Sequence, residues 1–168
     1  IYGVAEEAGK RNLVFGQCHG YFFDFLKPGL SKDEYDYHKM LQVRSFKCCQ
    51  ILNAKVCVLH PETVYSAVDY EKQYLAANTA FYQQALEESE DFDFRIAIEN
   101  MCDYGIAPKR KFGAYPEQLM MLMESLNSSR IGLCWDFEHA DIMGQNQRDC
   151  LLYIRDYLIA THVSDTYS

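Results

Sequence analysis

Residues 131–139, IGLCWDFEH, lead from a short run of apolar and small residues directly into two acidic side chains and an imidazole. An apolar run of this length, bounded by polar residues, is typical of a strand that is buried on both faces of a sheet. Asp136 and His139 follow where such a strand would end. Taken alone the pair is ambiguous, because Asp136 could simply cap the next helix. Its meaning depends on how the other strands end.

Four more apolar runs of this kind are expected along the chain, and segments with helical spacing separate them. Pro61 closes one of these runs, since proline cannot donate a hydrogen bond to a strand ladder. Strands that alternate with helices are typical of βαβ units and a parallel sheet. The expected strands are 13–18, 55–60, 94–98, 131–135 and 158–163.

The expected helices begin at recognisable signals. Ser31 and Glu34 have the S-x-x-E form of a capping box, which predicts a helix from there to about residue 52. Pro116 suits the first turn of a helix to about residue 126. On the capped helix we expect His38 to face solvent, and the apolar face to contain Tyr37, Met40, Leu41, Cys48, Ile51 and Leu52. Further helices are expected up to residue 10, around 70–85 and over 148–157.

The chain has 168 residues, of which 49% are hydrophobic, and this predicts a single globular domain over 1–168. A parallel sheet covered on both sides fits a doubly wound open sheet or a (β/α)8 barrel. The chain starts at Ile1 and stops at Ser168 just after an apolar run, so we expect it to be a piece of something longer.

Charge and cysteine usage argue against several function classes. The net charge of −8 argues against nucleic-acid binding, which needs clustered positive charge, and the one compact basic run, 109–111, is expected to be a solvated loop. No apolar stretch approaches the roughly 18 residues of a membrane helix. The seven cysteines include no C-x-x-C pair, so we expect buried structural thiols in a reducing, cytoplasmic location.

Every expected strand delivers an ionisable side chain at its carboxyl end. In a barrel these ends converge on one face, so residues far apart in sequence meet there. Imidazole nitrogen and carboxylate oxygen together suit Zn, Mn, Fe or Co. The candidate site residues are His19, His60, Glu99, Asp136, His139 and His162.

Four of these strand ends resemble a known family. The segments VLHP at 58–61, IAIEN at 96–100, CWDFEHA at 134–140 and THVSD at 161–165 are similar to successive strand-end motifs of the xylose isomerase-like TIM barrels. That superfamily contains sugar and sugar-phosphate isomerases and epimerases, and also endonuclease IV. The resemblance implies an α/β fold of the (β/α)8 type, represented here by a partial barrel of about strands 2 to 6.

The resemblance also implies a site and a reaction. One divalent metal ion, Mn, Mg, Co or Zn, is expected on Glu99, Asp136 and His162, and the family's fourth ligand, a Glu after the eighth strand, is not among the 168 residues. Glu99 and His139 are the expected catalytic residues for proton transfer through an enediolate, and His19, His60 and His139 are expected to contact the substrate. The implied partner is a small sugar or sugar phosphate, and a homo-oligomer is compatible with it.

Two other functions stay open at this point. An endonuclease IV-like, zinc-dependent apurinic/apyrimidinic nuclease would use the same six candidate residues, but the acidic charge and the residues MCDYG after Asn100 argue against it. A non-catalytic barrel remnant is the other alternative. Because five strands leave two unpaired edges and one ligand missing, we expect little or no turnover from this chain alone.

Overall fold

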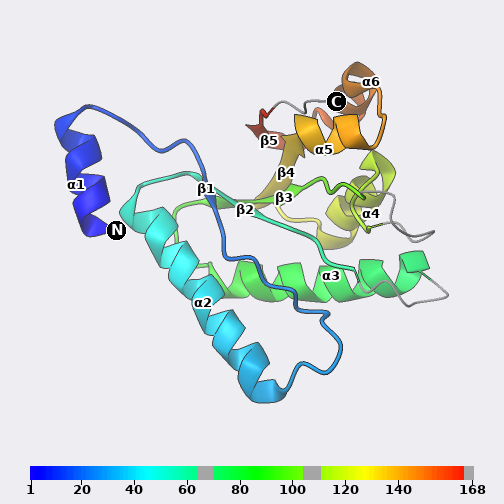
Figure 1. Ribbon diagram of the computed structural model, residues 1–168, viewed down its shortest axis with the longest axis horizontal. Helices are drawn as coiled ribbons and strands as arrows, with labels where there is room; N and C mark the ends of the chain where they lie inside the picture. Colours follow the sequence, from blue (N-terminus) through cyan, green and yellow to red (C-terminus); the bar gives the residue numbers. More distant parts are fainter. Residues whose placement is uncertain (64–69, 104–110, 165–168) are drawn as a thin grey trace.

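Five parallel strands form one sheet in the computed structural model, which describes residues 1–63, 70–103 and 111–164 (Figure 1). Each strand pairs with the next one in sequence, in the order β1-β2-β3-β4-β5. This sequential order belongs to a barrel and not to a doubly wound sheet, whose strand order reverses at its centre. The strands are β1 Cys18–His19, β2 Val56–Leu59, β3 Arg95–Glu99, β4 Ile131–Asp136 and β5 Leu158–His162. The sheet is therefore half of a barrel, as expected.

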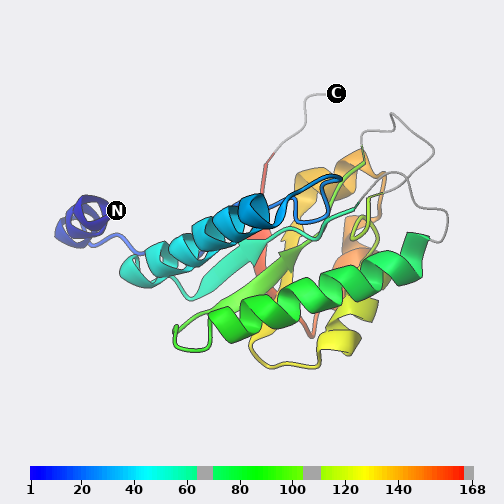
Figure 2. The same cartoon turned by 90° about the horizontal axis from the view of Figure 1, so that it is seen from below.

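The helices follow one another along the sheet, apart from α1, which projects away from it in both views (Figures 1 and 2). Between β4 and β5 there are two short helices where one was expected over 148–157. Asp136 caps the first of them, because its side chain accepts a hydrogen bond from the His139 amide. The helices are α1 Tyr2–Lys10, α2 Lys32–Ile51, α3 Tyr70–Glu88, α4 Pro116–Leu126, α5 Phe137–Ile142 and α6 Gln147–Ile154. No helix in the described part of the chain is long and apolar enough to cross a membrane.

The capping box at α2 is confirmed, and the expected faces of this helix are partly wrong. The Ser31 side chain accepts from the Glu34 amide, and the Glu34 carboxylate accepts from the Ser31 amide at 2.9 Å. His38 does not face solvent: its Nδ1 lies 2.9 Å from the Tyr21 hydroxyl, and its ring stacks on Phe23. Tyr37 and Met40, which were expected on the apolar face, are 57% and 45% exposed. The segment between β1 and α2 covers the face with His38, a contact that helical spacing cannot reveal.

The first expected strand, 13–18, is also shortened. Only Cys18 and His19 pair with β2, whereas Leu13 is exposed and Val14 is 92% exposed. Apolar character alone does not make a strand, because a strand needs a hydrogen-bonded neighbour, and residues 13–17 have none in the described sheet.

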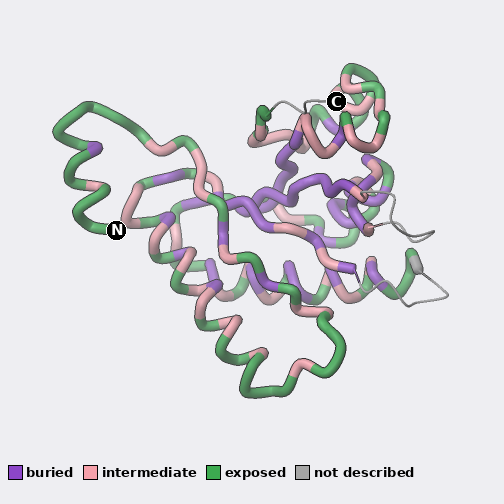
Figure 3. The backbone as a smooth tube through the Cα atoms, viewed as in Figure 1, coloured by how far each residue is buried: buried purple, intermediate pink, exposed green. Residues whose placement is uncertain are grey.

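Side chains alternate between the two faces of the sheet and make two apolar layers. The outward layer packs under the helices and contains large side chains such as Ile98, Leu133 and Trp135. The inward layer is built from the small residues Val58, Ala97 and Cys134. Figure 3 shows β2, β3 and β4 as the buried centre of the molecule, whereas the edge strands β1 and β5 are only partly buried. The seven cysteines are thiols that form no disulfides, and Cys49, Cys57, Cys102 and Cys134 are buried, consistent with small core residues.

Candidate metal centre

Strand alternation explains why the candidate residues share one face. On β3, Ile96 and Ile98 pack outward, so Ala97 and Glu99 face the inside of the barrel. On β4, Trp135 packs outward and Asp136 lies on the same side as Cys134. His19, His60 and His162 come from the carboxyl ends of β1, β2 and β5 and meet these carboxylates. All six predicted site residues are thus brought together around Glu99.

One oxygen of Glu99 contacts the histidines of β1 and β2. Its Oε2 lies 3.2 Å from His19 Nε2 and 3.2 Å from His60 Nε2. The two Nε2 atoms are themselves 3.1 Å apart. Glu99 is only 2% exposed, so this contact is shielded from water. Three potential ligand atoms this close together form an arrangement that a bound cation would stabilise.

The other oxygen of Glu99 contacts the histidines that follow β4 and end β5. Its Oε1 lies 3.1 Å from His162 Nδ1 and 3.5 Å from His139 Nδ1. His162 Nδ1 is also 3.6 Å from Asp136 Oδ2. Glu99 therefore lies between two sets of donors, and each set contacts a different carboxylate oxygen.

Backbone carbonyls fix the proton positions on two of the imidazoles. His19 Nδ1 lies 2.9 Å from the Gly20 carbonyl oxygen, and His139 Nδ1 lies 2.7 Å from the Asn100 carbonyl oxygen. A carbonyl oxygen can only accept, so each Nδ1 carries a proton. In the neutral ring Nε2 keeps a lone pair that a cation could use, and in the imidazolium His19 Nε2 donates to Glu99 Oε2. Such bonds are what orient histidine ligands in metal sites.

Asn100 joins β3 to β4 directly behind the site. Its buried amide donates to the Asp136 carbonyl oxygen at 2.9 Å and accepts from the Asp136 backbone N–H. The side chain therefore holds the ends of the two strands that carry Glu99 and Asp136 in register. Asn100 was not among the predicted site residues; the Glu-Asn pair that ends β3 was the available signal.

The charge states follow from burial and these contacts. Burial raises the pKa of Glu99, but hydrogen bonds from His19 and His60 and the electrostatic effect of His60 and His162 outweigh it, so the pKa lies well below its ordinary value. Burial lowers the pKa of His60. Burial alone would lower the pKa of His19, but its hydrogen bonds to Glu99 and to the Gly20 carbonyl oxygen, together with the charge of Glu99, raise it. Glu99 is thus a carboxylate at neutral pH, and His60 a neutral imidazole.

These donors fit a divalent cation. Within the described residues, three groups have potential ligand atoms within 4.8 Å of one another, and all three contain Glu99: with His19 and His60, with Cys134 and His162, and with Asp136 and His139. Burial and the nearby carboxylates of Glu99 and Asp136 raise the pKa of the Cys134 thiol, so this residue stays protonated and is a poor ligand. Imidazole and carboxylate ligands remain, and they suit Zn, Co or Mn.

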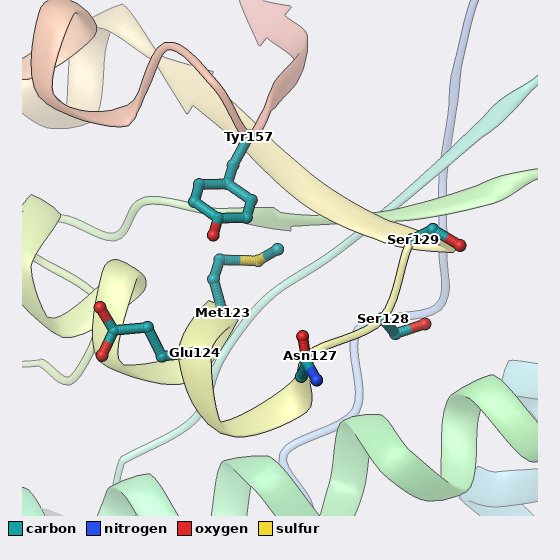
Figure 4. A pocket seen from close by; sticks show the side chains of 6 residues that line it. All are labelled: Met123, Glu124, Asn127, Ser128, Ser129 and Tyr157. Carbon is teal, nitrogen blue, oxygen red and sulfur yellow. The ribbon is translucent and has the colours of Figure 1, made fainter.

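A groove of about 400 Å³ lies at the opposite end of the strands (Figure 4). Tyr157, which precedes β5, points toward Met123 near the end of α4, and Asn127, Ser128 and Ser129 lie before β4. None of the six candidate residues lines this groove. In barrels of this kind the catalytic residues lie at the carboxyl ends of the strands, so we assign the groove no role in the chemistry.

Comparison with known proteins agrees with this architecture. The family model described as xylose isomerase-like TIM barrel matches residues 4–168. An uncharacterized protein of Methanocaldococcus jannaschii, MJ1311, is 27% identical over 94 residues, which are 55% of this chain and 31% of that protein.

Two solved structures share the fold. A D-tagatose 3-epimerase-like protein superposes with a TM-score of 0.81 at 18% identity, over 97% of this chain and 60% of its own. The Escherichia coli 3-keto-D-glucoside 4-epimerase YcjR gives a TM-score of 0.78 at 11% identity, over 96% of this chain and 63% of its own. The chain thus spans less than two thirds of these relatives. It belongs to the xylose isomerase-like TIM barrel family.

Proposed function

We propose that this chain provides the metal-binding half of a sugar or sugar-phosphate isomerase or epimerase. The observation that carries the proposal is the buried carboxylate of Glu99, which lies within 3.5 Å of four imidazoles at the mouth of the half-barrel. The names of the structural neighbours support it, since one is a D-tagatose 3-epimerase-like protein and another a D-allulose 3-epimerase bound to D-allulose.

Each residue has a role in this proposal. Glu99, Asp136 and His162 would hold one Mn, Mg, Co or Zn ion, which polarises the carbonyl and hydroxyl oxygens of the substrate when bound. A carboxylate, Glu99 by the expectation from the sequence, would take the proton from the carbon next to the carbonyl and leave an enediolate. The depressed pKa of Glu99 supports the role of ligand more strongly than that of base, because an efficient base has a pKa near the working pH.

The histidines would bind substrate oxygens. His139 donates its Nδ1 proton to the Asn100 carbonyl oxygen, so its Nε2 can accept a hydrogen bond from a substrate hydroxyl at the moment of proton transfer. His19 and His60 are 29% and 17% exposed at their side chains and lie at the same mouth, where they would contact further hydroxyl groups.

Metal binding tests the proposal directly. We expect the chain to bind Co²⁺, and Glu99→Gln to weaken the binding by at least about 100-fold, since loss of a ligand costs more than the 10- to 100-fold of an outer-shell change. Glu124→Gln, an exposed carboxylate near the opposite groove, is the matched control. Calorimetric titration measures both. Equal Co²⁺ affinity in the two variants would refute the metal site.

Proton transfer is tested with D-fructose in deuterium oxide. We expect the metal-loaded chain to exchange a carbon-bound hydrogen of the sugar slowly, as followed by proton NMR, and Glu99→Gln to abolish this exchange. Exchange that continues unchanged in Glu99→Gln would remove this residue from the reaction.

The paired histidines on Oε2 of Glu99 favour a second candidate, a zinc-dependent nuclease. His19 and His60 form a donor set separate from Asp136 and His162, so Glu99 could bridge more than one ion. The net charge of −8 opposes DNA binding. A measured content of two or more Zn²⁺ ions per chain, together with cleavage of DNA that contains an abasic site, would favour the nuclease over the isomerase.

A further inference from the structure

Phe22 is an exposed aromatic residue at the mouth of the candidate site. Its ring stacks on His19 with 4.5 Å between centroids and 25° between planes. It also meets His60 edge-on at 4.9 Å. The residue nevertheless remains 65% exposed, so most of the ring is open next to the two imidazoles.

The neighbours of Phe22 in sequence hold it in this position. In an extended segment alternate side chains point to opposite sides. Tyr21 and Phe25 point toward the helices: the Tyr21 hydroxyl lies 2.9 Å from His38 Nδ1, and the Phe25 ring stacks on Phe81 at 3.9 Å with 6° between planes. Phe23 is buried between them. Phe22 is the member of this aromatic run that must point away from the core.

The exposure of Phe22 has an energetic cost. A phenylalanine that leaves most of its ring in water forgoes the free energy of burial, and all three aromatic residues around it are at least half-buried. The ring contributes no hydrogen bond, so it cannot replace a polar substrate contact. What it offers is a flat apolar surface beside groups that would bind hydroxyls, which matches a ligand with one polar and one C–H face.

We propose that Phe22 is the platform on which the C–H face of the substrate sugar stacks, and that it contributes to the choice of substrate. This inference rests on the proposed function, because it assumes that a sugar binds at Glu99. The sugar would lie with its hydroxyl oxygens toward His19 and His60 and its carbon-bound hydrogens over the Phe22 ring. Polyols too small to cover the ring would gain little from it.

The experiment compares Phe22→Ala with Phe22→Trp in the Co²⁺-loaded chain. We titrate D-allulose and D-fructose, with glycerol as the small polyol, and follow binding by NMR. We expect Phe22→Ala to bind the two sugars about 3- to 10-fold more weakly than the wild type, which is the size of an aromatic stacking contact. Phe22→Trp keeps an aromatic ring and should retain the wild-type affinity. The affinity for glycerol and the visible spectrum of Co²⁺ should not change. Tyr153→Ala is the control. It removes an exposed aromatic side chain on α6, away from Phe22 in the sequence, and should bind sugar as the wild type does.

The possible outcomes separate this proposal from the proposed function. Unchanged sugar affinity in Phe22→Ala would overturn the platform and leave the metal site standing. A Co²⁺ spectrum that shifts in Phe22→Ala would also overturn it, because the ring would then act on the metal site and not on the sugar. If the wild-type chain binds Co²⁺ through Glu99 but neither sugar, the platform fails while metal binding holds. Failure to bind Co²⁺ at all refutes the proposed function first.

Discussion

Glu62, in the loop after β2, should make the protein less stable as the pH rises. Burial raises the pKa of its carboxyl group from 4.5 to about 7; Lys111 opposes this increase and Asp24 adds to it. The backbone at Glu62 is tied down, because its N–H donates to Asn78 Oδ1 and its carbonyl oxygen accepts from Asn78 Nδ2, both at 2.9 Å. The carboxyl group is partly buried at this position, which disfavours its charged form, so we expect Glu62→Gln to stabilise the protein at alkaline pH.

The sign and size follow from proton linkage. The unfolded chain releases the Glu62 proton near pH 4.5, whereas the folded protein keeps it to about pH 7. Between these values the folded state binds more protons, so its stability falls as the pH rises and then levels off above pH 7. Because a tenfold change in proton affinity is worth about 1.4 kcal/mol, the whole increase in pKa corresponds to up to about 3 kcal/mol of unfolding free energy.

Urea unfolding followed by circular dichroism at pH 5, 6, 7 and 8 measures this effect. We expect the Glu62→Gln variant to match the wild type within about 1 kcal/mol at pH 5 and to exceed it by up to about 3 kcal/mol at pH 8. Glu124→Gln, a surface change of the same kind, should follow the wild type throughout. A difference between Glu62→Gln and wild type that is the same at all four pH values would refute the assignment of a raised pKa.

Three further changes test the fold that supports the site. Ser31→Ala removes the capping box of α2 and should lower the unfolding free energy by about 1 kcal/mol, whereas Ser31→Thr should retain most of it; thermal unfolding measures both. Gly132→Ala would place a Cβ 2.8 Å from the Tyr157 carbonyl oxygen and should lower the unfolding free energy by about 1 to 3 kcal/mol. Gly3→Ala has open space around it and should not destabilise the protein; urea titration compares the two variants. Trp135→Phe loses the 2.8 Å bond from Nε1 to Gln147 Oε1 in a buried site and should cost about 2 kcal/mol in the same titration, so an unchanged midpoint would contradict the role of this bond.

Local signals predicted most of the elements correctly. The capping box marked the start of α2, and Pro116 marked the first residue of α4, whose bounds match the prediction of 116–126. These signals succeed because they act within one turn of chain. The apolar runs before His60, Glu99, Asp136 and His162 are likewise strands, since a strand buried on both faces needs apolar side chains at nearly every position.

Long-range contacts account for the features that local patterns did not reveal. His38 lies on a helix face that looks polar, yet Tyr21 and Phe23 from the preceding segment cover it. Leu13 and Val14 look like a strand, yet no neighbouring strand pairs with them in the described sheet. Phe22 looks like the aromatic residues next to it in sequence. Only the folded structure shows that Tyr21 and Phe25 contact α2 and α3, whereas Phe22 stays exposed.

The sequence alone determines which polar side chain follows each strand, because both the end of an apolar run and the residue after it can be read from the order of residues. The set His19, His60, Glu99, Asp136, His139 and His162 could therefore be chosen from the order of residues. How these side chains meet depends on the folded arrangement. Parallel pairing brings the strand ends to one face, and burial of Glu99 turns one carboxylate oxygen to His19 and His60 and the other to His162 and His139. That division depends on angles between strands, which no single strand encodes.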